Sequence, residues 1–348
     1  MPWSKFESNY TAPTGGRTLT YCAALREGID QAMGHDPRVF AIGLDADDKF
    51  GVFGSMSNLT HKDRVFGTPI SENAMTGVAI GAALSGLRPI HVHLRVDFMM
   101  TAIDQIVNYA AKWHDMFGRQ TKLPLVIRGI VGRGWGCGAQ HSQTLHGWFA
   151  HIPGLKVVTP ATAYDAKGLL LASVADDGPV LFLEHRWLYK NTGDVPEAIY
   201  TLPLGKAAHL HRGDGLTVVA NSLAAIEAHN AIRDSGLDVD LIDPRTIKPL
   251  DLETIVASVQ RTGRLLVVDH DFPFAGFAAE VVAAVTERAF HSLKQPPQRL
   301  TFPDSGMPAS RVLEAAYYPD SDRIGAAMQR LLYGQRIDSD LVTEVVPS

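Results

Sequence analysis

The feature of this sequence that most constrains its fold is a repeated alternation of short apolar runs with helix-like segments. A strand that is apolar at nearly every position has to be covered on both faces, as in a parallel sheet with helices on either side. Strands that alternate with helices along the chain favour the same architecture. The first half of the chain is therefore predicted to be a parallel α/β domain. Its expected strands are 39–43, 90–94, 124–128, 155–160 and 179–184, and its expected helices are 18–33, a segment from residue 73, and 99–116.

The alternation stops at a polar stretch and then resumes. With 348 residues the chain is long enough for two domains that each bury a core. We predict an α/β fold with a first domain at 1–190, a linker at 191–206, a second α/β domain at 207–335 and a loose tail at 336–348. The strands expected in the second domain are 216–220, 238–242 and 264–269, and its helices are 224–234, 252–260, 274–290 and 321–332.

Composition excludes several classes of protein. The 32 basic and 37 acidic residues are mixed, without a long basic run, so we expect neither nucleic acid nor a membrane surface as a partner. The two cysteines, Cys22 and Cys137, lie far apart, which fits a reducing compartment and no structural zinc. We find no signal-peptide pattern and no apolar stretch of about 18 to 20 residues, so a cytoplasmic location is expected.

One acidic residue, Glu72, stands just ahead of a segment rich in glycine and alanine. Taken alone, Ser71 and Glu72 can be a plain helix start, in which Ser71 caps the helix and Glu72 favours its positive end. The small residues that follow also leave room for a flat ligand beside the carboxyl group. A carboxyl group shielded from water can share a proton with a ring nitrogen. Glu72 is thus either a capping residue or a ligand for a planar nitrogen heterocycle, which we interpret as a pyrimidine.

An aromatic residue, Phe98, follows the next expected strand. By itself such a ring is more often part of a core than a stacking platform. Together with Glu72, however, it suits a flat heterocycle. The neighbouring Asp97 either reaches the cofactor or caps the helix expected from about residue 99, and the two alternatives stay open.

A glycine-rich loop at 132–143 (GRGWGCGAQHSQ) is the most distinctive passage of the chain. Glycine at alternate positions is unsuited to helix or strand and lets a backbone approach a ligand closely. His141 follows it, flanked by Gln140 and other hydrogen-bonding residues, and suits an acid–base or anion-stabilising group. A solvated loop histidine is an equal alternative. The nearby histidines lack ligand spacing and are expected to be structural: His91, His93, His146 and His151.

Two cofactor motifs are incomplete. Gly134, Gly136 and Ala139 match a dinucleotide fingerprint, but no acidic residue follows at the end of the next strand, which disfavours a nicotinamide enzyme. The passage at 213–215 (GDG) is similar to the start of a diphosphate–magnesium motif. It opens a strand, and no asparagine follows to complete a metal site. We therefore expect this chain to lack its own phosphate anchor.

Taken in order, these motifs resemble the β subunit of heteromeric 2-oxoacid dehydrogenases, the thiamine-diphosphate-dependent decarboxylating component. The resemblance runs from about residue 17 to 332, nearly the whole chain. The passages that carry it are 68–72 (TPISE), 86–90 (GLRPI), 104–106 (DQI), 140–143 (QHSQ), 152–158 (IPGLKVV), 164–170 (YDAKGLL) and 242–251 (IDPRTIKPLD).

The resemblance implies a fold and a set of roles. It implies an N-terminal pyrimidine-binding, transketolase-like domain followed by a C-terminal transketolase-type domain. Glu72 matches the glutamate that hydrogen-bonds the aminopyrimidine nitrogen, and Phe98 the aromatic residue that packs on that ring. His141 matches the active-site histidine, and we expect Asp97 and Gln140 to help bind thiamine diphosphate. Some members bind a potassium ion through mostly backbone oxygens at positions that match Leu125, Ser173 and Asp176.

The resemblance also implies partners. An α subunit would carry the diphosphate–magnesium motif, the β subunits would associate within a heterotetramer, and a lipoyl acyltransferase core would accept the acyl group from a small 2-oxo acid. Two other functions stay open: a different thiamine-dependent reaction, such as carboligation or acyl transfer in a biosynthetic pathway, and a non-catalytic assembly subunit.

Overall fold

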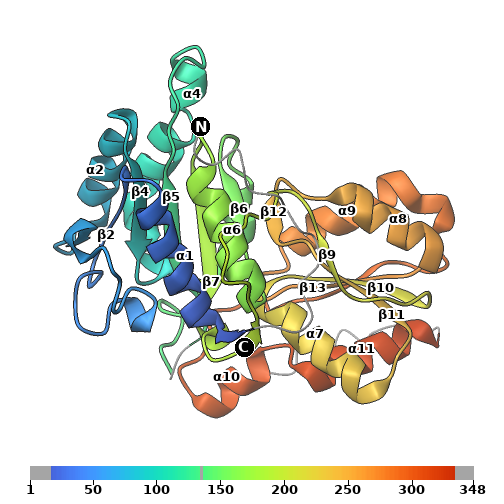
Figure 1. Cartoon of the computed structure of the whole chain (residues 1–348). Coiled ribbons are helices and arrows are strands. Elements are labelled where there is room, and N and C mark those ends of the chain that lie inside the picture. The colour runs from blue at the N-terminus through green and yellow to red at the C-terminus, as the bar shows by residue number, and fades with distance from the viewer. Residues whose placement is uncertain (1–16, 134–135, 334–348) are drawn as a thin grey trace. The chain divides into compact units, whose positions relative to one another are not determined.

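The computed structural model describes residues 17–133 and 136–333. The predicted tail at 336–348 lies outside these residues, as do Gly134 of the glycine-rich loop and the first sixteen residues. The chain forms two compact units. The first is Met1–Val131 with Phe149–Leu204, and the second is Gly132–Trp148 with Gly205–Ser348, so the glycine-rich loop belongs to the second unit. Figure 1 shows helices and strands alternating along both.

The first unit is built on a parallel sheet, as the apolar runs predict. Within this unit the strand order is β6-β7-β5-β4-β2-β3, and every neighbouring pair is parallel. A separate antiparallel pair joins β1 to β8, and β8 lies within the segment predicted as a linker. The strands are β1 (Thr18–Thr20), β2 (Val39–Gly43), β3 (Val65–Gly67), β4 (Arg88–His93), β5 (Val126–Val131), β6 (Lys156–Val158), β7 (Val180–His185) and β8 (Thr192–Asp194).

Helices cover this sheet. Helix α1 lies against α6, where the side chain of Lys167 donates to Glu27 at 2.7 Å. The single helix predicted at 99–116 is instead divided into short α-, 3₁₀- and π-helical turns. The helical elements are α1 (Tyr21–His35), η1 (Val52–Gly54), η2 (Lys62–Arg64), α2 (Glu72–Leu84), α3 (Val96–Met99), η3 (Met100–Ala102), η4 (Gln105–Ala110), α4 (Trp113–Met116), α6 (Ala163–Ala175) and η5 (Arg186–Leu188). Helix α5 (His146–Ala150) begins in the second unit and ends in the first.

One glycine allows β2 and β4 to pair closely at the end where both strands finish. Gly43 lies opposite Val92 in the parallel register. A β-carbon on Gly43 would lie only 2.4 Å from the carbonyl oxygen of Val92, so the position has no room for a side chain. The carboxyl ends of parallel strands meet at one edge of a sheet, the usual place for a ligand in open α/β folds.

The second unit has its own five-stranded sheet in the order β14-β13-β10-β11-β9. Only β9 is antiparallel to its neighbour. Helices α8 and α9 lie on one face of this sheet and α7 and α11 on the other (Figure 1). The elements are β9 (Ala208–His211), β10 (Leu216–Ala220), α7 (Ser222–Ser235), β11 (Val239–Asp243), β12 (Thr246–Lys248), α8 (Leu252–Thr262), β13 (Leu265–Val268), α9 (Phe277–Ala289), η6 (Phe290–Ser292), β14 (Gln298–Leu300), α10 (Arg311–Tyr317) and α11 (Ser321–Leu332).

Among the described residues, the helices are too short or too polar for any of them to cross a lipid bilayer.

Candidate functional site

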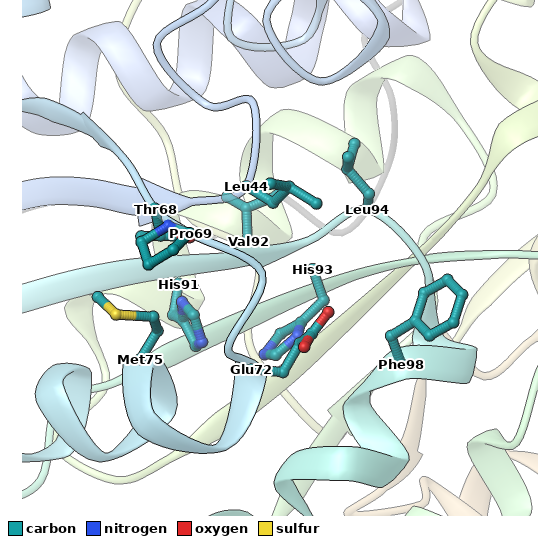
Figure 2. Close-up of a pocket in the computed structure, with 10 residues that line it drawn as sticks. All are labelled: Leu44, Thr68, Pro69, Glu72, Met75, His91, Val92, His93, Leu94 and Phe98. Atoms are coloured by element: carbon teal, nitrogen blue, oxygen red, sulfur yellow. The ribbon is translucent and has the colours of Figure 1, made fainter.

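A small pocket opens at the edge of the first unit where β2 and β4 end. Its cavity volume is about 30 Å³. Glu72 and Phe98, which the sequence singles out as a pair, both line it (Figure 2). Two residues that directly follow β2 and β4, Leu44 and Leu94, contribute to the walls. The lining residues are Leu44, Thr68, Pro69, Glu72, Met75, His91, Val92, His93, Leu94 and Phe98.

Glu72 is the first residue of α2 and is half-buried. The capping interpretation predicts a hydrogen bond from a backbone N–H of α2 to the Ser71 side chain, and the structure has none. Ser71 adopts φ −162° and ψ 64°, and its hydroxyl does not serve as a cap. Within the described part of the chain, the carboxylate of Glu72 has no hydrogen-bond or ion-pair partner. A helix N-terminus favours a negative charge, so Glu72 presents an uncommitted carboxylate at a suitable place.

Phe98 lies in the short helix α3, just after β4. Its ring is half-buried rather than part of the core, and it lines the pocket. In the view of Figure 2, Glu72 lies between Met75 and Phe98. An aromatic wall next to a carboxylate suits a flat ring that also carries a hydrogen-bonding nitrogen.

Asp97 is buried beside this wall and does not line the pocket. Its carboxylate pairs with the guanidinium of Arg95, at 3.3 Å between Oδ2 and Nε. Asp97 is the second residue of α3, and Arg95 occupies the N-cap position, so Asp97 is not the capping residue of this helix. A direct contact of Asp97 with a cofactor remains a prediction.

Two histidines that the sequence marks as structural, His91 and His93, also line the pocket. Alternate positions of β4 place both rings on one face of the strand, with their centroids 4.3 Å apart. Burial lowers the pKa of His91 to about 4, against the opposing effect of its hydrogen bond to the carbonyl of Ile42. Burial, with a smaller contribution from His91, holds the pKa of His93 well below its ordinary value. Both rings are therefore neutral at physiological pH.

No spacing rule identifies these histidines as site residues. One signal in the sequence could have indicated them. They are two polar residues at alternate positions of an otherwise apolar strand, and this strand follows the helix that begins at Glu72. Alternation of this kind marks one face of a strand. It does not reveal which helix that face meets.

The glycine-rich loop presents Gln140 and His141 in the second unit. Gln140 is exposed and His141 is half-buried, and the backbone N–H of His141 donates to the carbonyl of Gly138 at 3.3 Å. Gly136 has φ of 75°, and a β-carbon there would lie 2.7 Å from the carbonyl oxygen of Ala309. This glycine therefore allows a left-handed turn and a close approach that other residues would hinder.

His146 anchors the same loop to the sheet of the second unit. Its Nε2 lies 2.7 Å from Oδ1 of Asp269 and 3.7 Å from Oδ2 of Asp271. The backbone N–H of Gly147 also donates to Asp271, at 3.1 Å. Burial alone would lower the pKa of His146, but the two carboxylates outweigh it and raise the pKa to about 9. The loop is thus held by a buried imidazolium and its two acidic partners.

Both halves of the chain match known protein families. The family described as transketolase, pyrimidine binding domain, matches residues 17–192, and the transketolase C-terminal domain matches residues 205–324. The acetoin:2,6-dichlorophenolindophenol oxidoreductase subunit beta of Cupriavidus necator is 41% identical over 91% of this chain and 98% of its own length. The pyruvate dehydrogenase E1 component subunit beta of Rickettsia conorii is 40% identical over 90% of this chain and 98% of its own. The chain belongs to the β-subunit family of the thiamine-dependent 2-oxoacid dehydrogenases.

A solved structure shares the fold of this family member. The chain titled split gene transketolase, inactive beta4 tetramer, superposes with a TM-score of 0.69 and 21% sequence identity, over 92% of this chain and all of the other. The predicted fold, a pyrimidine-type parallel-sheet domain followed by a transketolase-type α/β domain, is therefore confirmed, as is the family resemblance. In this family the cofactor is thiamine diphosphate.

The residues matched to a potassium site of the family are mostly engaged by protein groups. The hydroxyl of Ser173 donates to the carbonyl of Leu169 at 2.7 Å, and the Asp176 carboxylate accepts from Lys156 at 2.7 Å. The carbonyl of Leu125 accepts a backbone hydrogen bond. A carbonyl oxygen has two lone pairs, so backbone coordination of a cation stays compatible with these contacts, and the potassium site remains a prediction.

The passage at 213–215, similar to a diphosphate–magnesium motif, has a structural role in the second unit. Asp214 pairs with the guanidinium of Arg261 at 2.7 Å. A β-carbon on Gly213 would lie 2.5 Å from Oδ1 of Asp238, so close packing explains this glycine. Among the described residues, no cluster of three or more histidine, cysteine, aspartate or glutamate side chains could hold a metal ion.

Proposed function

We propose that this chain provides the pyrimidine-binding part of a thiamine-diphosphate site completed by an α subunit. The observation that carries the proposal is the unpartnered carboxylate of Glu72, which lines one pocket together with the half-buried ring of Phe98. A carboxylate can hydrogen-bond a ring nitrogen while an aromatic ring packs on the face of the heterocycle. The relationship to the family supports this interpretation.

The size of the pocket supports a shared site. Its volume is about 30 Å³, whereas pockets for cofactor-sized ligands usually enclose about 300 to 1,000 Å³. The walls described here therefore do not enclose such a ligand by themselves. We propose that the α subunit holds the diphosphate and its magnesium ion, and that two β subunits associate within the heterotetramer.

Thiamine diphosphate, when bound, supplies the chemistry that splits a carbon–carbon bond next to a carbonyl and holds the electron pair. The protein has to bind, orient and exchange protons. Glu72 would share a proton with the pyrimidine nitrogen, and Phe98 would fix the plane of the ring and exclude water from it. From the family resemblance we assign His141 to proton transfer or charge stabilisation, and Gln140 and Asp97 to cofactor binding.

The reaction we propose is oxidative decarboxylation of a small 2-oxo acid, pyruvate being the first to test, with transfer of the acyl group to a lipoyl group on an acyltransferase core. A second substrate, acetoin, is favoured by a specific observation. A relative with 41% identity is the β subunit of an acetoin oxidoreductase that is named for a dye acceptor.

The test uses the heteromer obtained by co-expression with an α subunit that contains the diphosphate–magnesium motif. Glu72→Gln should lower turnover by about 10²- to 10⁴-fold, the usual contribution of acid–base catalysis, and leave assembly intact. Glu253→Gln is the matched control, because Glu253 is exposed in the first turn of α8 in the second unit. Unchanged turnover in Glu72→Gln would remove Glu72 from the mechanism.

The substrate is identified with the same preparation. Pyruvate, a branched-chain 2-oxo acid and acetoin are compared with 2,6-dichlorophenolindophenol as electron acceptor, and then with a lipoyl domain. Turnover of none of them, in a heteromer that binds thiamine diphosphate, would favour a biosynthetic carboligase or acyl-transfer enzyme. Failure to bind the cofactor would favour an assembly subunit.

A further inference from the structure

Three buried polar side chains form a connected group behind Glu72, and the proposed function does not use them. Thr76 lies one turn after Glu72 on α2, and His91 and His93 lie on β4. The exposed fractions of Thr76, His91 and His93 are 0%, 2% and 3%. Buried polar groups are rare unless they are hydrogen-bonded or functional. The two histidines also line the pocket itself (Figure 2).

The hydrogen-bond partners of His91 fix the position of its proton. Its Nδ1 lies 3.1 Å from the carbonyl oxygen of Ile42. A carbonyl oxygen only accepts, so Nδ1 of His91 carries a hydrogen and donates it. The ring is neutral, because burial lowers the pKa of His91 to about 4. Its Nε2 is therefore unprotonated and accepts the hydroxyl hydrogen of Thr76, over 3.0 Å.

The same reasoning extends to His93. The Thr76 hydroxyl has one hydrogen, which it donates to His91, so its oxygen can only accept from another neighbour. Nε2 of His93 lies 3.5 Å from that oxygen, and this contact requires a hydrogen on Nε2. Burial keeps the His93 ring neutral. Its Nδ1 must then be the unprotonated nitrogen, with a free lone pair.

We propose that this relay, from Ile42 through His91 and Thr76 to His93, makes His93 a hydrogen-bond acceptor in the wall of the Glu72 pocket. A heterocyclic amine carries an amino group close to its ring nitrogen. His93 would accept from the amino group while Glu72 contacts the ring nitrogen. His93 is then a binding residue, and Thr76 and His91 are positioning residues that act through it. This inference deepens the proposed function and rests on it.

The first experiment measures the tautomers directly and does not depend on activity. Long-range ¹H–¹⁵N correlation spectra of the full chain, labelled with ¹⁵N-histidine, distinguish a protonated Nδ1 from a protonated Nε2. We expect His91 as the Nδ1–H form and His93 as the Nε2–H form, both unchanged from pH 8 to pH 6. A protonated Nδ1 on His93, or a charged ring at pH 6, would overturn the proposal.

The second experiment breaks the relay at its centre. Thr76→Val removes the hydroxyl and nearly keeps the shape, whereas Thr76→Ser restores the hydroxyl. In the heteromer, Thr76→Val should raise the KM for thiamine diphosphate by roughly 3- to 10-fold, the value of one hydrogen bond, with kcat little changed. The His93 ring should then show both tautomers. Thr76→Ser should behave as the wild type.

The matched control is Thr286→Val, because Thr286 is also a helix residue with a hydrogen-bonded hydroxyl, which donates to the carbonyl of Val282 within α9 of the second unit. An unchanged cofactor KM in Thr76→Val would refute the relay. Glu72→Gln keeps this result separate from the proposed function. If Glu72→Gln is inactive and Thr76→Val is normal, the relay alone fails, and if Glu72→Gln is fully active, the proposed function fails whatever the spectra show.

Discussion

Replacing His146 by glutamine should remove a pH-dependent part of the stability of the second unit. His146 is 3% exposed and lies between the carboxylates of Asp269 and Asp271. The side-chain amide of Asn221 also donates a hydrogen bond to Asp269, at 3.1 Å. Burial opposes the ionisation of Asp269, but the charge of His146 and the hydrogen bonds outweigh it, so the pKa of Asp269 is lowered. Glutamine can keep a hydrogen bond to Asp269 but cannot carry the positive charge.

The magnitude follows from the pKa of His146. A rise from 6.5 to about 9, at about 1.36 kcal/mol for each pH unit, corresponds to about 3 kcal/mol of stability. Because the folded pKa is above the unfolded one, this stabilisation is complete below pH 6.5 and is lost as the pH rises through about 9. The value agrees with the cost of about 3 to 5 kcal/mol for removing one partner of a buried ion pair.

The assay compares the pH dependence of two proteins. Chemical unfolding of the wild type and of His146→Gln is followed at pH 6.5, 8 and 9.5 by tryptophan fluorescence, to which Trp148 contributes from beside the site. The difference in free energy of unfolding should be about 3 kcal/mol at pH 6.5 and close to zero at the highest pH. His291→Gln, which changes an exposed histidine of the same unit, should show no such difference.

Parallel pH profiles for the wild type and His146→Gln would refute the reasoning, because they would mean that His146 is neutral in the folded protein. A direct NMR titration gives a second check. The His146 ring should titrate near pH 9, and a midpoint below 6.5 would show that burial outweighs the two carboxylates.

Two further predictions concern the first unit. Arg128→Met should lower the free energy of unfolding by about 3 to 5 kcal/mol, because it leaves the buried carboxylate of Glu184 without its bidentate partner. The double variant Arg128→Met/Glu184→Gln should lose clearly less free energy of unfolding than Arg128→Met alone. Equal losses for the two variants in denaturant unfolding would contradict this. Gly43→Ala should separate β2 from β4 and lower both stability and the affinity of the heteromer for thiamine diphosphate, because the new β-carbon meets Val92. Wild-type values in calorimetry and cofactor titration would show that the strands adjust without loss.

The fold could be predicted from the sequence because its determinants are local. Apolar runs of five or six residues, alternating with helical segments, favour buried parallel strands. The division of the helix expected at 99–116 into several short helical turns could not be predicted in the same way. The transitions among α-, 3₁₀- and π-helical turns there depend on small changes of hydrogen-bond partner, and π turns insert an extra residue without a composition signature.

The candidate site was predictable only in part. Glu72 and Phe98 were found because a helix start and a strand end are readable from nearby residues. Serine is a common helix cap, so the capping alternative for Ser71 was reasonable. In the structure, however, the Ser71 side chain makes no capping hydrogen bond. His91 and His93 were assigned to structure because their partner, Thr76, becomes apparent only when β4 packs against α2. Tertiary contacts of this kind leave no spacing pattern in the sequence.

The neutrality of the two histidines bears on how Glu72 can work. Among the residues that line the described pocket, Glu72 has the only acidic side chain, and the only basic side chains are the two neutral histidine rings. A cation beside a carboxylate holds it ionised, and a second anion favours its protonated form. A wall that is polar but uncharged does neither. If Glu72 contacts a pyrimidine nitrogen as we propose, the exchange of a proton at Glu72 would then be governed by that nitrogen, which is the property that a proton-sharing carboxylate requires.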